Sequence, residues 1–250
     1  SAEPIARQFR EQGALKVIYD IEPVKSIALA RNRSIQNSTG NLVAFIDDDE
    51  FPAEDWLTRM RRCLKDHQAD GVLGPVLPHF PSGSPKWLLE SGLCDRPRNA
   101  TGSPIRGIDF RTGNILFRRR VFRAQDMWFD PSRGRGGEDG DFLFRQIRAG
   151  RKYVWCDEAL VHETVPEERL VADYYLKRHF KIGKMVGKDY RRLRMNGAAL
   201  ISFFSILGLS LVLPFSVFGG QASWSRVLCK IYYHGGAILS FLDLAHLNED

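Results

Sequence analysis

A short apolar run that ends in consecutive acidic residues restricts the folds that this chain can adopt. Leu42 to Ile46 contains Val, Phe and Ile, and Gly40 precedes the run. About five residues of this β-branched and aromatic content predict a strand buried on both faces. Asp47 to Asp49 follow at once, and Pro52 prevents a continued ladder-forming strand. Acid at the carboxyl end of a buried strand matches the place where open α/β sheets bind ligands, although a solvated acidic turn would read the same way.

The segments around this run alternate between strand and helix patterns. Leu15 to Tyr19 is a strand candidate, and a helical pattern runs from Ser26 towards Gly40. Strand, helix and strand in close succession predict a parallel βαβ unit. Further helices are expected over Ala53 to Leu64 and after Gly137, and further strands over Gly71 to Leu77, Ile115 to Phe117 and Tyr153 to Cys156.

A second acidic group stands at the start of a predicted helix. Glu138, Asp139 and Asp141 precede the apolar positions of that helix, which Gly150 ends. Acids in a first turn also suit the helix dipole, so simple capping is the alternative interpretation.

The two acidic groups predict a site that works with oxygen ligands. A divalent cation held by Asp47 and Asp49 could bridge the oxygens of a diphosphate, and Mg²⁺ or Mn²⁺ suits such ligands better than zinc does. A separate carboxylate could take a proton from an attacking hydroxyl. These features fit group transfer from a nucleotide diphosphate and also fit hydrolysis of phosphate esters.

The composition indicates a globular protein with one basic region. Apolar residues make up 44% and charged residues 26% of the 250 residues, so disorder is not expected. The net charge of +6 is concentrated between Lys177 and Arg194, which predicts a local anionic partner. Because these basic residues border an apolar segment and do not alternate with aromatic ones, nucleic acid is not the expected partner. The four cysteines lack CxxC spacing and are expected to be reduced thiols.

The C-terminal part carries a membrane signal. No residue from Met195 to Ser225 is charged, and Ala198 to Phe218 is long enough to cross a hydrocarbon core as a helix kinked at Pro214. A second apolar segment, Ile231 to Leu244, could lie at the interface or return through it. The alternative for Ala198 to Phe218 is a buried helix of a soluble protein. The basic residues before it favour the membrane, with the preceding domain on the cytoplasmic side.

Three motifs together resemble one enzyme family. They are ARNRSIQNSTGNLVAFIDDDEFP at Ala30 to Pro52, TGN at Thr112 to Asn114, and GGEDGDFLFRQIRAG at Gly136 to Gly150. In this order and spacing, over Leu15 to Glu168, the chain resembles family 2 glycosyltransferases of the α/β class with the nucleotide-diphospho-sugar transferase fold called GT-A, in particular those of bacterial exopolysaccharide assembly. The resemblance implies a mostly parallel sheet flanked by helices.

The resemblance also implies roles for single residues. The Asp triplet would be the DxD-type site, with Asp49 and Asp47 on the metal, and Asp47 or Asp48 near the ribose and diphosphate. Asp139 would be the general base of an inverting transfer, and Glu138 its substitute. Gly113 and Asn114 would border the donor sugar and acceptor, and Arg31 and Arg33 could face the nucleotide.

Two family features are missing. The first strand and the Asp that reads the uracil are not found before Leu15, so the chain is expected to be incomplete at its N-terminus. A Gln-x-x-Arg-Trp motif after the base is also absent, which favours addition of a single sugar.

These features predict the following organisation and partners. Residues 1–168 would form the transferase domain, 169–194 a basic juxtamembrane helix, and 195–250 a membrane-associated region. The expected partners are a nucleotide-sugar donor such as a UDP-sugar, a lipid-linked oligosaccharide acceptor and the bacterial inner membrane. A metal-dependent phosphohydrolase and a non-catalytic membrane protein that binds sugar nucleotides stay open as alternatives.

Overall fold

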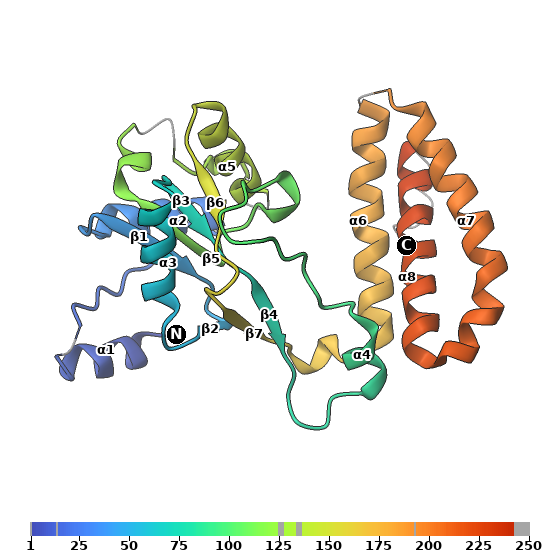
Figure 1. The fold of residues 1–250 in the computed structure, drawn as a ribbon, viewed down its shortest axis with the longest axis horizontal. Helices are drawn as coiled ribbons and strands as arrows, with labels where there is room; N and C mark the ends of the chain where they lie inside the picture. The colour runs from blue at the N-terminus through green and yellow to red at the C-terminus, as the bar shows by residue number, and fades with distance from the viewer. Residues whose placement is uncertain (1, 14, 125–127, 134–136, 193, 243–250) are drawn as a thin grey trace. The chain divides into compact units, whose positions relative to one another are not determined.

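The computed structural model describes residues 2–13, 15–124, 128–133, 137–192 and 194–242. It divides into two compact units, shown in Figure 1. The sheet unit comprises Ser1–Leu77 and Arg96–Glu163, and the helical unit comprises Pro78–Asp95 and Thr164–Asp250. The division at Glu163 lies close to the domain boundary expected at residue 168, and the segment 78–95 belongs with the C-terminal part.

A four-stranded sheet is the centre of the sheet unit. Its order is β1-β5-β3-β6, formed by Leu42–Ile46, Asn114–Arg118, Gly71–Leu73 and Tyr153–Trp155. β5 pairs antiparallel with both β1 and β3, and β3 pairs parallel with β6. A smaller sheet has the order β2-β7-β4, formed by Glu50–Pro52, Val161–Thr164 and Val76–His79.

The structure corrects two predictions about β1. Residues 15–19 form no strand in the described structure, so no parallel βαβ unit leads into β1. β1 lies at the edge of the described sheet, where Ala44 is exposed and Ile46 is 38% exposed. The expected burial on both faces is therefore wrong, because the sequence of an apolar run does not say how many neighbours it has.

Helices cover both faces of the larger sheet. The helices of the sheet unit are α1 (Glu3–Glu11), α2 (Ile27–Asn37), α3 (Trp56–Asp66) and α5 (Glu138–Arg148). Side chains of α2 and α5 pack with Ile115 and Phe117 of β5 in one core cluster, whereas α3 packs with Leu116 in another. Because successive strand residues point to opposite faces, β5 contributes to both clusters. The predicted α/β layering with helices on both sides is confirmed. The expectation of a mostly parallel sheet is corrected, because in the larger described sheet only the β3–β6 pairing is parallel.

The ends of these helices follow from local sequence. The Ser26 hydroxyl accepts a hydrogen bond from the Leu29 N–H at 3.3 Å, which caps α2 at its start. Gly137 precedes α5 with φ of +83°, a conformation that favours glycine. Short 3₁₀ turns complete the chain at Gly107–Asp109, Arg119–Phe122, Pro131–Arg133, Glu167–Arg169 and Val217–Gly219.

The helical unit contains α4 (Lys86–Ser91), α6 (Ala172–Arg192), α7 (Asn196–Ser216) and α8 (Gly220–Phe241). α8 packs against both α6 and α7 (Figure 1). Glycines allow the α6 and α8 backbones to approach closely: a Cβ at Gly183 would lie 1.9 Å from the Tyr233 carbonyl oxygen, and one at Gly187 would lie 2.1 Å from that of Ala237. The basic helix expected near 169–194 and the apolar helix near 198–218 are present as α6 and α7.

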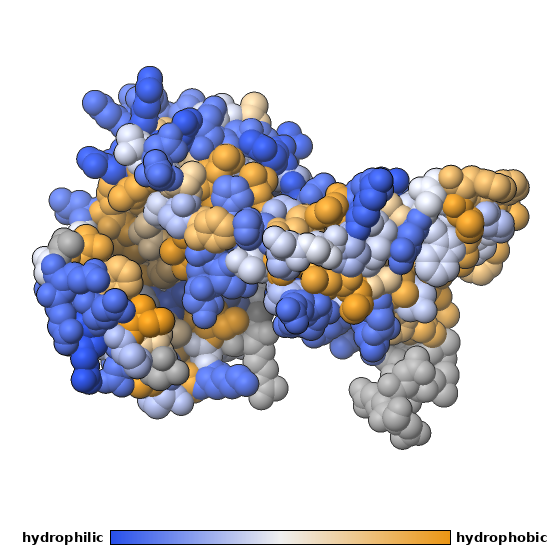
Figure 2. Space-filling model, turned by 90° about the horizontal axis from the view of Figure 1, so that it is seen from below, coloured by the Kyte–Doolittle hydropathy of each residue, from blue (hydrophilic) through white to orange (hydrophobic). Residues whose placement is uncertain are grey.

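Large apolar side chains of α7 face outward. Ile201, Phe204, Leu211 and Phe215 are each at least 65% exposed, and Figure 2 shows apolar residues gathered where α7 lies. The stretch Gly197–Phe241 is long and apolar enough to cross a membrane, and only 6% of its most apolar window is buried. The alternative of a soluble core helix does not fit this exposure. The second apolar segment lies in α8, and its residues 243–244 fall outside the described residues.

Candidate active site

The pairing of β1 with β5 brings the acidic triplet to the TGN turn. Ile46, the last residue of β1, lies opposite Asn114, the first residue of β5. Gly113 is thereby placed beside the first acid of the triplet: a Cβ built on it would lie 2.9 Å from Asp47 Oδ2 and 2.6 Å from Glu50 Oε1. Any side chain at this position would clash with these oxygens. Glycine is therefore needed for both carboxylates to keep their present positions.

Glu50 belongs to this site, although the sequence did not indicate it. The Asp47 N–H donates a hydrogen bond to Glu50 Oε2 at 3.1 Å. Burial raises the pKa of Glu50 to about 7 and also raises the pKa of Asp47, which the Arg31 guanidinium opposes. Asp48 and Asp49 are exposed. In the sequence, only its position next to the triplet indicated that Glu50 could belong to the site.

Arg31 connects the two acidic groups. One of its terminal nitrogens forms a close ion pair with Glu138 Oε1, and the other lies 3.8 Å from Asp47 Oδ1. The guanidinium also lies 5.6 Å from the centre of the Phe129 ring, and the side chain is 15% exposed. The structure therefore brings together the predicted residues Arg31, Asp47 and Glu138, which come from three separate parts of the chain.

Glu138 and Asp139 have different surroundings at the start of α5. Glu138 is 4% exposed, and Arg31 engages one oxygen of its carboxylate. Asp139 is only half-buried; its Oδ1 accepts a hydrogen bond from the Gly140 N–H at 2.7 Å. Burial raises the pKa of Asp139 above its ordinary value. Of the two, Asp139 is the more exposed. Gly136, the first residue of this motif, lies outside the described residues.

Asn114 points into the protein and not into the site. It is 0% exposed, and its Oδ1 accepts a hydrogen bond from Trp56 Nε1 at 2.8 Å. Its Nδ2 donates to the carbonyl oxygens of Pro75 and Ala159, each at 2.8 Å. Asn114 was expected, with Gly113, to border the donor sugar and acceptor, and that stays a prediction; in the structure the polar atoms of its side chain hold the turn. Gly113, one residue earlier, is the part of the motif that faces the acids.

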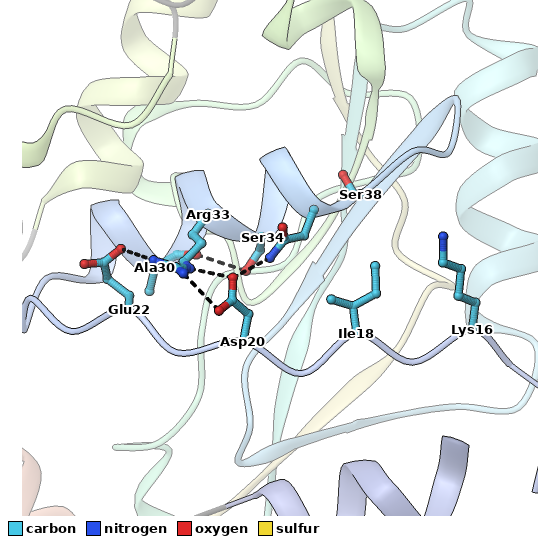
Figure 3. Close-up of a pocket in the computed structure, with 9 residues that line it drawn as sticks. Lys16, Ile18, Asp20, Glu22, Ala30, Arg33, Ser34 and Ser38 are labelled. Atoms are coloured by element: carbon cyan, nitrogen blue, oxygen red, sulfur yellow. Dashed lines mark hydrogen bonds and ion pairs between the residues drawn. The ribbon is translucent and has the colours of Figure 1, made fainter. Parts of the chain in front are cut away.

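Arg33 lies apart from these residues, in the groove that Figure 3 shows. Its guanidinium pairs with both oxygens of Asp20, at 2.5 and 3.0 Å, and lies 3.5 Å from Glu22. Arg33 and the Asn37 amide hold the pKa of Asp20 below its ordinary value. The groove, of about 370 Å³, lies between the segment 16–22 and α2. Arg31 and Arg33 were each expected to be able to face the nucleotide, and the structure gives them different acidic partners.

A second charged group adjoins Glu50 and was not apparent in the sequence. Glu163 lies opposite Glu50 in the β2–β7 pair and forms a close ion pair with Arg96. The Arg111 guanidinium lies 5.4 Å from the centre of the Trp155 ring, and burial together with the charge of Arg96 lowers its pKa to about 10. No motif marks these arginines, because their grouping depends on loops that meet only in the folded chain.

The donor set fits a hard divalent cation. Asp47, Asp48, Asp49 and Glu50 offer only oxygen ligands, which Mg²⁺ and Mn²⁺ prefer. Across the described ranges, no group of three or more His, Cys, Asp or Glu is already arranged to hold a metal. A cation there would complete its shell with water and substrate oxygens, as Mg²⁺ commonly does.

Solved structures share this fold. A mannosyltransferase from Pyrobaculum calidifontis in complex with GDP-Man and Mn²⁺ has a TM-score of 0.55 at 15% identity, covering 97% of this chain and 75% of that one. S. aureus TarS 1-349 in complex with UDP-GlcNAc has a TM-score of 0.51 at 15% identity, covering 97% and 79%. These likenesses show that the chain has the glycosyltransferase GT-A fold.

Sequence relatives agree with the fold. The succinoglycan biosynthesis protein ExoM of Rhizobium meliloti is 32% identical over 99% of this chain and 82% of that protein. The glycosyltransferase AglE of Haloferax volcanii is 28% identical over 72% of this chain and 57% of that protein. The family model for glycosyl transferase family 2 matches residues 1–125. The chain therefore belongs to glycosyl transferase family 2, and its activity is that of a glycosyltransferase.

Proposed function

We propose that this protein is an inverting glycosyltransferase of bacterial surface polysaccharide biosynthesis. It would move a sugar from a nucleotide-diphosphate donor to a lipid-linked or oligosaccharide acceptor. The observation that carries the proposal is the convergence of the acidic triplet, Gly113 and the start of α5 around Arg31. The similarity to ExoM, a succinoglycan biosynthesis protein, supports the polysaccharide context.

The donor side of the site would be the acidic triplet. Asp49 and Asp47 would hold Mg²⁺ or Mn²⁺, and Asp47 or Asp48 would lie near the ribose and diphosphate. When bound, the cation would neutralise the charge that develops on the departing diphosphate. The Mn²⁺ of the mannosyltransferase complex supports use of a divalent metal. Gly113 would leave room for the donor sugar beside Asp47, since a side chain there meets the carboxylates.

Asp139 would be the general base. Its carboxylate would take the proton of an acceptor hydroxyl as the hydroxyl oxygen bonds to the anomeric carbon of the donor. The bond from that carbon to the diphosphate breaks in the same step, so the configuration inverts. Half-burial and a raised pKa bring Asp139 closer to the pKa of an effective base at neutral pH. Glu138 would serve to hold Arg31, because its carboxylate is engaged there.

The helical unit would attach the enzyme to the cytoplasmic face of the inner membrane. Its helix α6 carries a series of basic residues, and α7 exposes an uncharged apolar surface. Basic residues next to an apolar helix suit anionic headgroups and the interior of a bilayer. Such an attachment would place a lipid-linked acceptor within reach.

The test is a donor screen with the full-length protein, membrane lipid extract and either Mn²⁺ or Mg²⁺. UDP-sugars and GDP-sugars are compared by mass spectrometry of the glycosylated lipid. Asp139→Asn should abolish transfer while calorimetry still detects donor binding, whereas Asp49→Ala should weaken metal-dependent donor binding.

Three outcomes would overturn the proposal or one of its assignments. Release of free sugar or sugar phosphate without an acceptor would favour a phosphohydrolase. Full transfer activity in Asp139→Asn would remove the base assignment. Cellular complementation by Asp49→Ala would favour a non-catalytic protein.

A further inference from the structure

Two cysteines far apart in the sequence meet on the side of the sheet covered by α3. Cys63 lies in α3, and Cys156 directly follows β6. The Cys63 thiol donates to the Trp155 carbonyl oxygen at 3.7 Å, next to Cys156 in the chain. The Cys156 thiol donates to the Arg59 carbonyl oxygen at 3.8 Å, one helical turn before Cys63. Each sulfur thus lies against the backbone beside the other.

Both thiols line one cavity, which is separate from the acidic site. The cavity has a volume of about 310 Å³, and its other lining residues are Arg59, Arg62, Asp66, His67, Thr101 and Glu158. Cys63 is 5% and Cys156 is 2% exposed, so bulk solvent barely reaches them except through this cavity. A water molecule takes roughly 30 Å³ of liquid volume, so hydrogen peroxide has ample space here.

The environment distinguishes the two thiols. The neighbouring Cys156 thiol lowers the pKa of Cys63, against burial and the charges of Glu158 and Asp66. The neighbouring Cys63 thiol and burial raise the pKa of Cys156. Cys63 is also the more exposed of the two, at 5% against 2%. Since the thiolate is the nucleophile of cysteine chemistry, we expect Cys63 to react first.

We propose that Cys63 and Cys156 form a dithiol site that peroxides oxidise to an intramolecular disulfide. The Cys63 thiolate attacks one peroxide oxygen, the O–O bond breaks, and the departing hydroxide takes a proton to become water. The Cys156 sulfur then attacks the sulfur of the resulting Cys63 sulfenic acid, whose S–O bond breaks to release a second water. Overall the two thiols lose two electrons and two protons, and one hydrogen peroxide becomes two water molecules.

The other two cysteines provide matched controls. Cys94 and Cys229 lie in the helical unit, where the Cys94 sulfur lies 2.9 Å from the Tyr175 hydroxyl oxygen and Cys229 is buried in the α8 core.

The experiment uses the reduced full-length protein, hydrogen peroxide and differential alkylation followed by peptide mass spectrometry. We expect one cross-linked peptide pair joining Cys63 to Cys156, reversed by dithiothreitol, with two of the four thiols lost. Cys63→Ser should slow peroxide consumption at least tenfold. Cys156→Ser should trap a Cys63 sulfenic acid that dimedone labels. Cys94→Ser and Cys229→Ser should leave the cross-link unchanged.

Several results would overturn this inference. They are failure of the cross-link to form in folded protein, dimedone labelling of Cys94 or Cys229 at the same rate as Cys63, and unchanged peroxide consumption in Cys63→Ser. Melting curves of each variant show whether it is folded. The readout is sulfur oxidation and does not depend on sugar transfer, so its outcome is separate from that of the proposed enzyme activity.

Discussion

Replacement of Asn114 by alanine tests whether this residue holds the active-site turn or contacts substrate. In the structure its amide makes three buried hydrogen bonds, to Trp56 Nε1 and to the Pro75 and Ala159 carbonyl oxygens. Asn114→Ala removes all three and leaves one buried donor and two buried acceptors without this partner. The turn that carries Gly113 would lose its attachment to α3 and to the ends of two strands.

The expected cost can be worked from these bonds. Each lost hydrogen bond of this kind costs about 1 kcal/mol, so the three together cost roughly 3 kcal/mol. For a chain of this size, about 1 kcal/mol lowers the melting temperature by roughly 2–4 °C, which gives a fall of about 6–12 °C. Asn114→Asp should cost at least as much despite its equal size, because a carboxylate oxygen would then face two carbonyl oxygens at 2.8 Å.

The assay is thermal and urea unfolding of the purified variants, together with donor KM. Asn99→Ala is a suitable control, since the Asn99 amide makes one hydrogen bond, to Asp109 at 2.9 Å, and its loss should cost about a third as much. If Asn114→Ala melts within about 2 °C of wild type while its donor KM rises tenfold, the buried role is refuted and direct contact with substrate is favoured.

Three further perturbations follow from the structure. Arg31→Met should lower kcat at least tenfold, with donor KM changed less, because it removes the bridge between the acidic groups; full activity in steady-state assays would contradict this role. Gly187→Leu should unfold the helical unit at lower temperature, because a Cβ meets the Ala237 carbonyl oxygen at 2.1 Å, whereas Gly208→Leu, with no neighbour within 4 Å, should not. The acid limb of the kcat/KM pH profile should lie above the ordinary aspartate range, because Asp139 must be ionised to act as base and its pKa is raised. Steady-state assays of the wild-type enzyme across pH check this, and an acid limb within the ordinary aspartate range would contradict the assignment.

Local sequence predicted the helices well because their signals are local. The Ser26 cap, the apolar period of α3 and the glycine before α5 each act within one or two turns of chain. The prediction of strand pairing failed because pairing joins residues that lie far apart in the sequence. Nothing in Leu42 to Ile46 states that its neighbour will be β5, that the pairing will be antiparallel, or that one edge will be open.

The side-chain positions in the candidate site were equally hard to predict from the sequence. The motifs identified Asp47, Gly113 and Asp139, but they could not show that Asn114 turns inward or that Arg31 bridges two acids. Glu50 carried no motif of its own. The approach of Cys63 to Cys156 was equally hidden, because spacing rules for cysteines describe neighbours in sequence and not across a sheet.

The antiparallel β1–β5 register is what turns separate motifs into one site. It sets Ile46 opposite Asn114, so the chain leaves β1 into the acids at the point where the TGN turn enters β5. A shift of one residue would exchange the two faces of β1 and move Gly113 away from Asp47. The buried amide of Asn114 fixes one side of this register through Trp56 of α3, and Arg31 of α2 fixes the other through Asp47 and Glu138. The helices on both faces of the sheet thus hold the acids at the positions that transfer chemistry would need. Loss of either Asn114 or Arg31 should therefore impair activity by displacing these acids.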